Sequence, residues 1–207
     1  MLEYDLDPQG RLRLLYGMRV YGRLWLGSFA LAAAAALAGC GGAVNVVAQG
    51  DDAKLMLHGI DAVSYFAAGK PVPGRSDIKT DHRGLTYRFA SDESRRQFIT
   101  NPERYAPQFG GFCAQSMAYA IPVATDAATF KIIDGRLYLF ASPRARLYFE
   151  MDQERNLKLA GSYWDTEVRD SNWRLQSWKR MLLRVPNFRS NPELAEEYER
   201  RFGRKPG

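Results

Sequence analysis

Residues 78–89 read IKTDHRGLTYRF, and polar and apolar side chains alternate on either side of Arg83-Gly84. Alternation with a period of two is typical of a strand with one buried face, and two turn residues that include glycine join antiparallel strands. The stretch therefore predicts a β-hairpin. A second hairpin is predicted at residues 130–140, where Asp134-Gly135 separates two apolar runs.

Helical signals surround these hairpins. Asp61 is placed to cap a short helix over residues 62–68, and Ser91-Asp92-Glu93-Ser94 opens a helix between the two hairpins. After Pro143 the pattern is helical, up to a final helix that starts at Asn191. Hairpins followed by helices, without alternation of strand and helix, predict an α+β fold. We expect a small antiparallel sheet of hairpins with short helices, followed by a helical C-terminal extension.

The composition sets the size and class of the protein. The chain has 207 residues, of which 46% are hydrophobic, and a net charge of +6 from 29 Lys and Arg against 23 Asp and Glu. These values indicate one domain with appendages that folds without disulfide staples. The two cysteines, Cys40 and Cys113, are too few for a four-cysteine zinc site or iron–sulfur cluster within one chain.

The N-terminal part has the pattern of an export signal. Residues 24–39 carry no charge, follow Arg19 and Arg23, and end directly before Cys40. Such a run is short for a membrane span and fits the core of a signal peptide. The ending Leu37-Ala38-Gly39-Cys40 resembles the bacterial lipobox, which implies that Cys40 carries a palmitate-type lipid anchor. The alternative is an ordinary secretory signal that contains a cysteine.

The same region suggests how the chain is divided. Its first ten residues contain three acids, which an export signal does not favour, so Met18 is the expected start. Gly41 after the acylated cysteine implies the outer membrane of a Gram-negative cell envelope. The expected parts are a signal peptide over 1–39, a lipidated tether over 40–54, a domain over 55–150 and the helical extension over 151–207.

Four stretches in the middle of the chain occur in a familiar order, namely residues 58–66 (HGIDAVSYF), 84–91 (GLTYRFAS), 98–107 (FITNPERYAP) and 110–113 (GGFC). Together they resemble the YHS domain, and most closely the small exported bacterial YHS proteins, some of which are selenoproteins. The resemblance implies binding of a metal or another small ligand, since better-understood YHS modules handle copper and other heavy metals through cysteines. Here Ala90 and Ser94 occupy a region where those modules carry cysteine.

Cys113 is the one thiol that remains if Cys40 carries a lipid, so it is the first candidate for a functional site. Gly110-Gly111 before it allows close approach of the backbone, and residues 114–120 after it can be helical. A helix N-terminus favours the thiolate, which is both the nucleophile and the metal ligand. The alternative is a buried cysteine that acts as a small apolar residue.

His58 and Asp61 are the other two candidates, because an imidazole and a carboxylate lie close together in sequence. With Cys113 they could bind copper or zinc, or His58 could act as a base for the thiol. A histidine that only stabilises the adjacent turn is the structural alternative, and His82 is expected to be exposed beside its hairpin turn. Three functions stay open: binding of a metal or small ligand, thiol-based redox or enzyme chemistry at Cys113, and an interaction module without chemistry.

Residues 164–185 are expected to form one amphipathic helix. Its apolar face consists of Trp164, Val168, Leu175, Trp178, Leu182 and Val185, and its other face carries Arg169, Trp173, Arg180 and Arg184. Between Ser171 and Ser190 there are five basic residues and no acidic one. Export excludes nucleic acid as a partner. The basic face is therefore expected either to contact anionic lipid headgroups or to be solvated while the apolar face packs on the domain. No protein partner is indicated.

Overall fold

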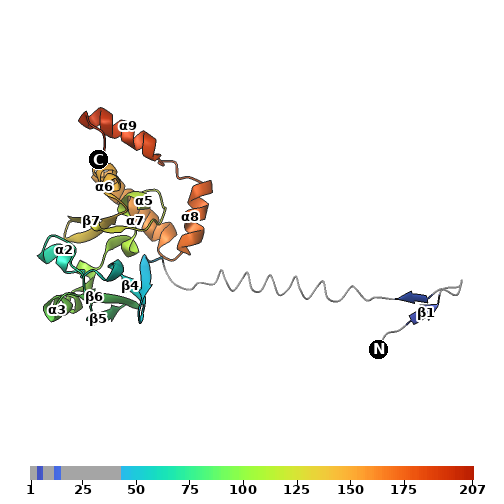
Figure 1. Cartoon of the computed structure of the whole chain (residues 1–207). Helices are drawn as coiled ribbons and strands as arrows, with labels where there is room; N and C mark the ends of the chain where they lie inside the picture. The colour runs from blue at the N-terminus through green and yellow to red at the C-terminus, as the bar shows by residue number, and fades with distance from the viewer. Residues whose placement is uncertain (1–3, 7–11, 15–42) are drawn as a thin grey trace. The chain divides into compact units, whose positions relative to one another are not determined.

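The computed structural model describes residues 4–6, 12–14 and 43–207 (Figure 1). The chain divides into two compact units, Met1–Cys40 and Gly41–Gly207. In the first unit, β1 (Tyr4–Leu6) pairs with β2 (Leu12–Leu14) in antiparallel orientation.

The expected signal peptide lies almost wholly outside the described residues. This holds for its apolar run 24–39, for the expected start at Met18 and for the lipidation site Cys40. These features therefore stay predictions.

The second unit contains a four-stranded sheet with the strand order β3-β4-β6-β5. Its strands are β3 (Val46–Gln49), β4 (Asp52–Met56), β5 (Arg75–His82) and β6 (Leu85–Phe89). A separate two-stranded sheet consists of β7 (Asp126–Ile133) and β8 (Arg136–Phe140). Strands in hairpins and helices in separate stretches of the chain confirm the α+β class.

The sheet is mixed, and the expectation of a purely antiparallel sheet was wrong at one strand pair. β4 pairs with β6 in parallel orientation, with Leu55 opposite Thr86. A tight turn joins only antiparallel neighbours, whereas parallel neighbours need a long connection. Residues 57–84 form that connection here, since they turn away after β4 and return through β5.

Both predicted hairpins are confirmed. His82 lies opposite Leu85 across the first turn, and Ile133 lies opposite Arg136 across the second. The turn residues Arg83-Gly84 have φ angles of +53° and +73°, and Asp134-Gly135 have +50° and +70°. Two successive positive φ angles define the type I′ turn, which matches the twist of the adjoining strands.

The first described residues of the second unit belong to the fold. Ala43 is buried, and its N–H donates to the Arg169 carbonyl at 2.8 Å, while the N–H of Asn45 donates to the Gly110 carbonyl at 2.8 Å. Strands β3 and β4 follow at once. Residues 43–54, which were expected to form a tether, are therefore part of the folded unit, because backbone pairing satisfies groups that a tether would leave to water.

The helices of the described chain are short. In the first half they are η1 (Leu57–Gly59), α2 (Ser64–Ala67), α3 (Asp92–Thr100), α4 (Pro102–Tyr105), η2 (Gln108–Gly111) and α5 (Ala114–Met117). In the second half they are α6 (Pro143–Glu150), α7 (Gln153–Tyr163), the π-helical turn η3 (Trp164–Val168), α8 (Trp173–Leu182) and α9 (Asn191–Phe202). None of these helices is both long and apolar enough to cross a membrane.

Capping residues start α3 and α9 as expected, whereas α2 is shorter than the expected 62–68 and follows Val63 without a side-chain cap. Ser91 Oγ accepts a hydrogen bond from the Ser94 N–H at the start of α3. At the start of α9, Ser190 and Glu193 form a reciprocal capping box. Each of these contacts satisfies backbone N–H groups that have no partner inside the helix.

The expectation of one continuous helix over residues 164–185 was wrong. The chain forms the π-helical turn η3, breaks at residues 169–172, and starts α8 at Trp173. Asn172 Oδ1 accepts hydrogen bonds from the N–H groups of Arg174 and Leu175. Short polar side chains such as Ser171 and Asn172 favour helix caps over helix interiors, which accounts for the break.

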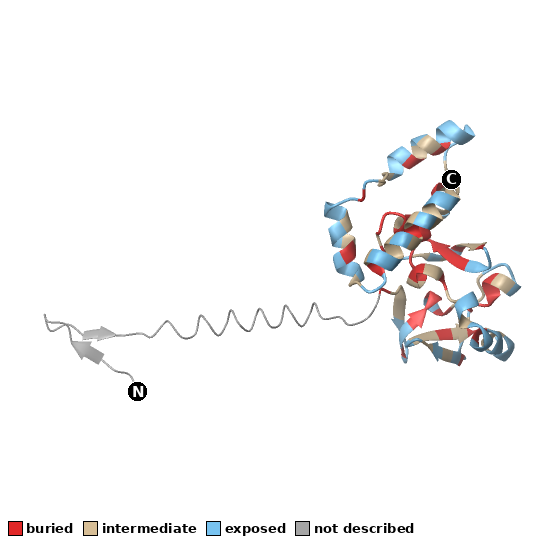
Figure 2. Ribbon diagram, turned by 180° about the vertical axis from the view of Figure 1, so that it is seen from behind, coloured by how far each residue is buried: buried red, intermediate tan, exposed pale blue. Residues whose placement is uncertain are grey.

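Strand β8 separates two clusters of buried side chains. Leu137 and Leu139 pack into one cluster with Phe89 of β6 and Phe98 of α3, whereas Tyr138 and Phe140 pack into the other with the helices that follow. Successive residues of a strand point to opposite faces, so β8 serves both clusters. Figure 2 shows buried residues, in red, on strands and helices of the second unit.

An ion network ties the four-stranded sheet together. The carboxylate of Asp52 is 3% exposed and accepts hydrogen bonds from Lys79 Nζ at 2.6 Å and Arg88 Nε at 2.7 Å. These contacts connect β4, β5 and β6. The hydrogen bond from Lys79, together with that from Arg88, outweighs the effect of burial and holds the pKa of Asp52 below its usual value.

Candidate functional site

His58 lies in an unusual turn between β4 and α2. Leu57, His58 and Gly59 have φ angles of +54°, +53° and +80°, and the turn is closed by a 3.0 Å hydrogen bond from the Ile60 N–H to the Leu57 carbonyl. Left-handed backbone is unfavourable for leucine and histidine. The turn leaves the His58 side chain exposed at the surface.

Asp61 is buried, and both of its carboxylate oxygens are engaged by the backbone. Oδ1 accepts from the Val63 N–H at 2.9 Å, and Oδ2 accepts from the Ala90 N–H at 3.0 Å. Asp61 therefore caps the turn before α2 and links this turn to the end of β6. Since these two N–H groups already occupy the carboxylate, its place in the structure is that of a cross-link within the fold.

Cys113 is also buried, at 1% exposure, within the cluster that contains Phe140 and Phe149. Its N–H donates to the Val123 carbonyl at 3.0 Å. The helix that follows, α5, ends at Met117 and comprises a single turn, shorter than the expected 114–120. The thiol lies in apolar surroundings, which are typical of a structural cysteine.

The three candidate residues do not form a metal site. Among the residues that the structure describes, no three His, Cys, Asp or Glu side chains lie close enough together to hold a metal ion. The set of His58, Asp61 and Cys113 thus does not supply three joint ligands, and the oxygens of Asp61 already accept hydrogen bonds. Imidazole and thiolate groups are ligands for copper and zinc, but the described residues do not bring three such side chains together.

Because Cys113 is buried, we expect its thiol to react slowly with alkylating reagents in the native protein. In the segment 41–207, whose one cysteine is Cys113, we expect iodoacetamide to modify the native protein at least about 100-fold more slowly than the urea-unfolded protein. Mass spectrometry of timed samples measures both rates. Rapid modification of the native segment at neutral pH would contradict the buried position and would favour a redox role for the thiol.

A large open cleft lies elsewhere, between the turns of the two hairpins. Its volume is about 1080 Å³, and it is lined by both turns, by residues 106–110, and by Ala43, Val44 and Trp164. Ligand sites in proteins are commonly concave surfaces of roughly 300–1,000 Å³. The cleft is thus large enough for a small molecule.

Basic side chains outnumber acidic ones in this cleft. The lining includes Lys54, Arg83, Arg104, Arg136 and Arg169 against Glu103, Asp134 and Asp170. Glu103 is engaged by Arg83 at 3.0 Å and by His82 Nε2 at 3.2 Å. Within the described part of the chain, Lys54, Arg104 and Arg136 have no carboxylate within 4.0 Å. These three cations are available to an anionic ligand.

The sequence did not indicate this cleft. Its lining comes from β4, both hairpin turns, α4, η2 and the segment before α8, and no local motif unites these segments. His82 was expected to be merely exposed, yet it lies at the rim of the cleft with an edge contact to Phe98 at 5.9 Å between ring centroids. The surplus of Lys and Arg over the whole chain was the only available signal.

The residues expected to contact lipid do not share one open face. Arg180 is largely buried and paired with Glu167, which also accepts from Lys179 Nζ at 2.9 Å. Arg169 pairs with Asp165 before α8 begins. Trp173 and Arg184 are exposed, and the Arg184 guanidinium lies 4.0 Å from the centroid of the Phe188 ring. The expectation that Arg180 belongs to a free basic face was wrong, because a carboxylate on η3 binds it.

Comparison with protein families gives one match. The family model described as "YHS domain" matches residues 63–109, a narrower range than the 55–150 over which the sequence resembles the family. The comparison with curated proteins and the comparison with solved structures each give no match.

Proposed function

We propose, from the YHS domain at residues 63–109, that this chain is a lipid-anchored binding protein of the bacterial cell envelope. The domain and the second hairpin together hold a small anionic ligand in the cleft between their turns. The lipid is attached at Cys40, and the membrane is the outer membrane of a Gram-negative cell. No catalytic step is assigned to the chain.

The observation that carries this proposal is the group of available cations in the cleft. Lys54 lies on β4, Arg104 on α4 and Arg136 at the start of β8, so three separate elements direct positive charge into one concave surface. Hydrogen bonds between such cations and a carboxylate or phosphate are shorter and stronger than neutral ones. An anion with several charged oxygens can contact more than one of them at once.

Two other functions have less support. A metal-binding role for His58, Asp61 and Cys113 lacks a cluster of ligands, and a redox role lacks an accessible thiol. An interaction module without chemistry is also compatible with the cleft. It would bind a larger partner there in place of a small ligand.

Citrate is a suitable probe for the cleft, since it is small and carries three carboxylates. We expect citrate to raise the melting temperature of the segment 41–207 in a concentration-dependent manner. Replacing Lys54→Gln and Arg136→Gln together should weaken citrate binding by at least about tenfold, because charged hydrogen bonds contribute about 1.5–3 kcal/mol each. Thermal unfolding at a series of citrate concentrations measures the effect.

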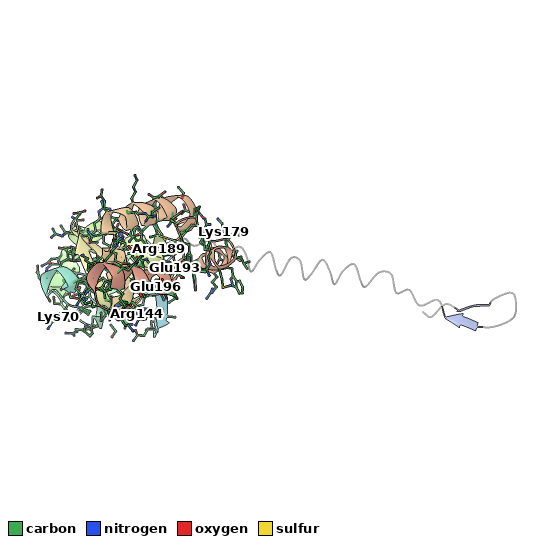
Figure 3. All side chains as sticks on the ribbon, turned by 90° about the horizontal axis from the view of Figure 1, so that it is seen from above. Lys70, Arg144, Lys179, Arg189, Glu193 and Glu196 are labelled. Carbon is green, nitrogen blue, oxygen red and sulfur yellow. The ribbon has the colours of Figure 1, made fainter. Side chains whose placement is uncertain are left out.

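A matched control removes two positive charges outside the cleft. Lys70 and Arg144 are exposed and do not line it, and both are labelled in Figure 3. The double variant Lys70→Gln/Arg144→Gln should bind citrate as the unaltered segment does. The proposal would be overturned if citrate did not raise the melting temperature of the unaltered segment. It would also be overturned if both double variants bound citrate equally weakly.

A further inference from the structure

Helix α8 packs on the rest of the protein through polar side chains. Gln176 is 5% exposed and donates from Nε2 to the Ala120 carbonyl at 3.1 Å. Ser177 Oγ donates to the Pro122 carbonyl at 3.3 Å, and Arg180 is held by Glu167. Apart from Trp173, whose ring centroid lies 6.2 Å from that of Phe112, the inward face of this helix is therefore hydrophilic, which is the reverse of an ordinary surface helix.

The outward face of α8 is apolar. Leu175, Trp178 and Leu182 are 49%, 61% and 75% exposed, although the sequence predicted them on the inward face. At 3.6 residues per turn they fall within about 60° of the helix circumference. Met181 and Leu183 are exposed beside them, and Figure 2 shows α8 with most of its surface exposed. A continuous group of exposed large apolar side chains marks a surface that contacts something else.

Positive charge borders this apolar face on both sides. Arg174 is exposed on one side of α8. Lys179, labelled in Figure 3, is exposed on the other side and pairs with Glu167 at 2.9 Å. Residues 171–190 carry five basic side chains and no acidic one. Tryptophan and leucine on one face with bordering Lys and Arg are typical of a helix that lies in the interface of an anionic membrane.

The chain before β3 also favours the membrane as the partner. The Ala43 N–H donates to the carbonyl of Arg169, four residues before α8 begins. Cys40 precedes Ala43 by three residues, a chain length of at most about 11 Å. Since residues 43–54 are folded, no long tether lies between the anchor and the domain. This step rests on the proposed lipidation of Cys40, and the apolar face of α8 stands independently of it.

We infer that α8 is a second membrane contact, in which Leu175, Trp178 and Leu182 enter the lipid interface and Arg174 binds anionic headgroups. The helix lies parallel to the membrane surface, because its polar side is held by the domain through Gln176, Ser177 and Arg180. One acyl chain gives only marginal, reversible membrane binding, so a second contact strengthens attachment. It also fixes the orientation of the domain.

The segment 41–207 tests this inference without the lipid, since this unit contains all the buried clusters of the described chain and carries its own core. It should co-sediment with vesicles of phosphatidylethanolamine and phosphatidylglycerol and should bind vesicles of phosphatidylcholine much less. Tryptophan emission should shift to shorter wavelength on binding. The double variant Trp178→Ser/Leu182→Ser should bind the anionic vesicles at least about tenfold more weakly.

Ile99 supplies a matched control, because it is 55% exposed on α3, which lies apart from α8 in Figure 1. The variant Ile99→Ser should bind vesicles as the unaltered segment does. Circular dichroism should show that all variants are folded, as exposed positions rarely affect stability.

Several results would overturn the inference: no binding of the unaltered segment to anionic vesicles, equal binding by the α8 double variant, or a dimer in analytical ultracentrifugation that this variant dissociates. The last result would assign the apolar face to a second copy of the chain. Failure of the proposed function is measured separately, by citrate binding and by the mass of the mature N-terminus, because neither depends on α8.

Discussion

Replacing Asp52→Ala is expected to lower the free energy of unfolding by about 3–5 kcal/mol, as removal of one partner from a buried ion pair typically does. Asp52 is 3% exposed, and the Arg88 side chain that it binds is 11% exposed. Without the carboxylate, the Arg88 guanidinium keeps its charge in a buried position with no counter-charge from β4. Strands β4, β5 and β6 also lose their shared polar contact.

Urea unfolding of the segment 41–207 measures this effect. Asp77→Ala provides the control, since Asp77 forms an exposed pair with Arg75 on β5 at 2.7 Å. Exposed pairs contribute little, so this variant should unfold nearly as the unaltered segment does. Similar decreases in the free energy of unfolding for both variants would contradict this prediction. They would show that the ion pairs of Asp52 do not owe their contribution to burial.

The Asp52→Ala variant should also change how the stability of the protein depends on pH. The pKa of Asp52 is lowered in the folded state by the hydrogen bonds from Lys79 and Arg88, so folding favours its ionised form. The resulting stabilisation is complete above the unfolded pKa of about 3.9 and is lost as the pH falls through the lower folded value. The difference in stability between the unaltered protein and Asp52→Ala should therefore shrink below about pH 4.

Replacing Gly110→Ala is expected to lower the free energy of unfolding by about 2–4 kcal/mol, because it combines left-handed backbone strain with overpacking. Gly110 has a φ of +58°, and an added Cβ would lie 2.5 Å from the Ala43 carbonyl oxygen and 3.0 Å from Trp164. The first contact is with backbone that is held in place by the hydrogen bond from the Ala43 N–H to the Arg169 carbonyl. The added methyl group would therefore push the N-terminal segment away from η2.

Gly135→Ala separates the two causes. Gly135 has a φ of +70°, but an added Cβ would meet no atom within 4 Å. In this variant only the left-handed backbone is unfavourable, which should lower the free energy of unfolding by about 1 kcal/mol. Thermal unfolding of both variants compares them. Equal losses would mean that the close approach of Ala43 to Gly110 does not contribute.

Much of the local structure could be predicted because adjacent residues determine it. Arg83-Gly84 and Asp134-Gly135 form the two expected hairpin turns, since glycine readily adopts the second positive φ of a type I′ turn. Ser91 starts α3 through a hydrogen bond to an N–H three residues away. The YHS resemblance likewise depended on short stretches in the expected order and at the expected spacing, and the family model matches residues 63–109.

The candidate site was harder to predict, because its chemistry depends on burial. The sequence indicated Cys113, His58 and Asp61 as candidates because of the chemistry of their side chains. The fold buries Cys113 among apolar side chains, exposes His58 on a left-handed turn, and uses the Asp61 carboxylate to hold two backbone N–H groups. A residue type shows what a side chain can do, and its neighbours in space decide whether solvent or a ligand can reach it.

The amino-acid order thus sufficed for the hairpins, the helix starts and the separation of strands from helices, since each depends on contacts within a few residues. The parallel pairing of β4 with β6, the cleft and the orientation of α8 depend on contacts between distant segments. Periodicity identified two faces of α8, but the hydrogen bond from Gln176 to Ala120, 56 residues away, turns the polar one inward. Packing of the whole chain decides which face meets the domain, because the free energy of a helix face depends on what lies against it.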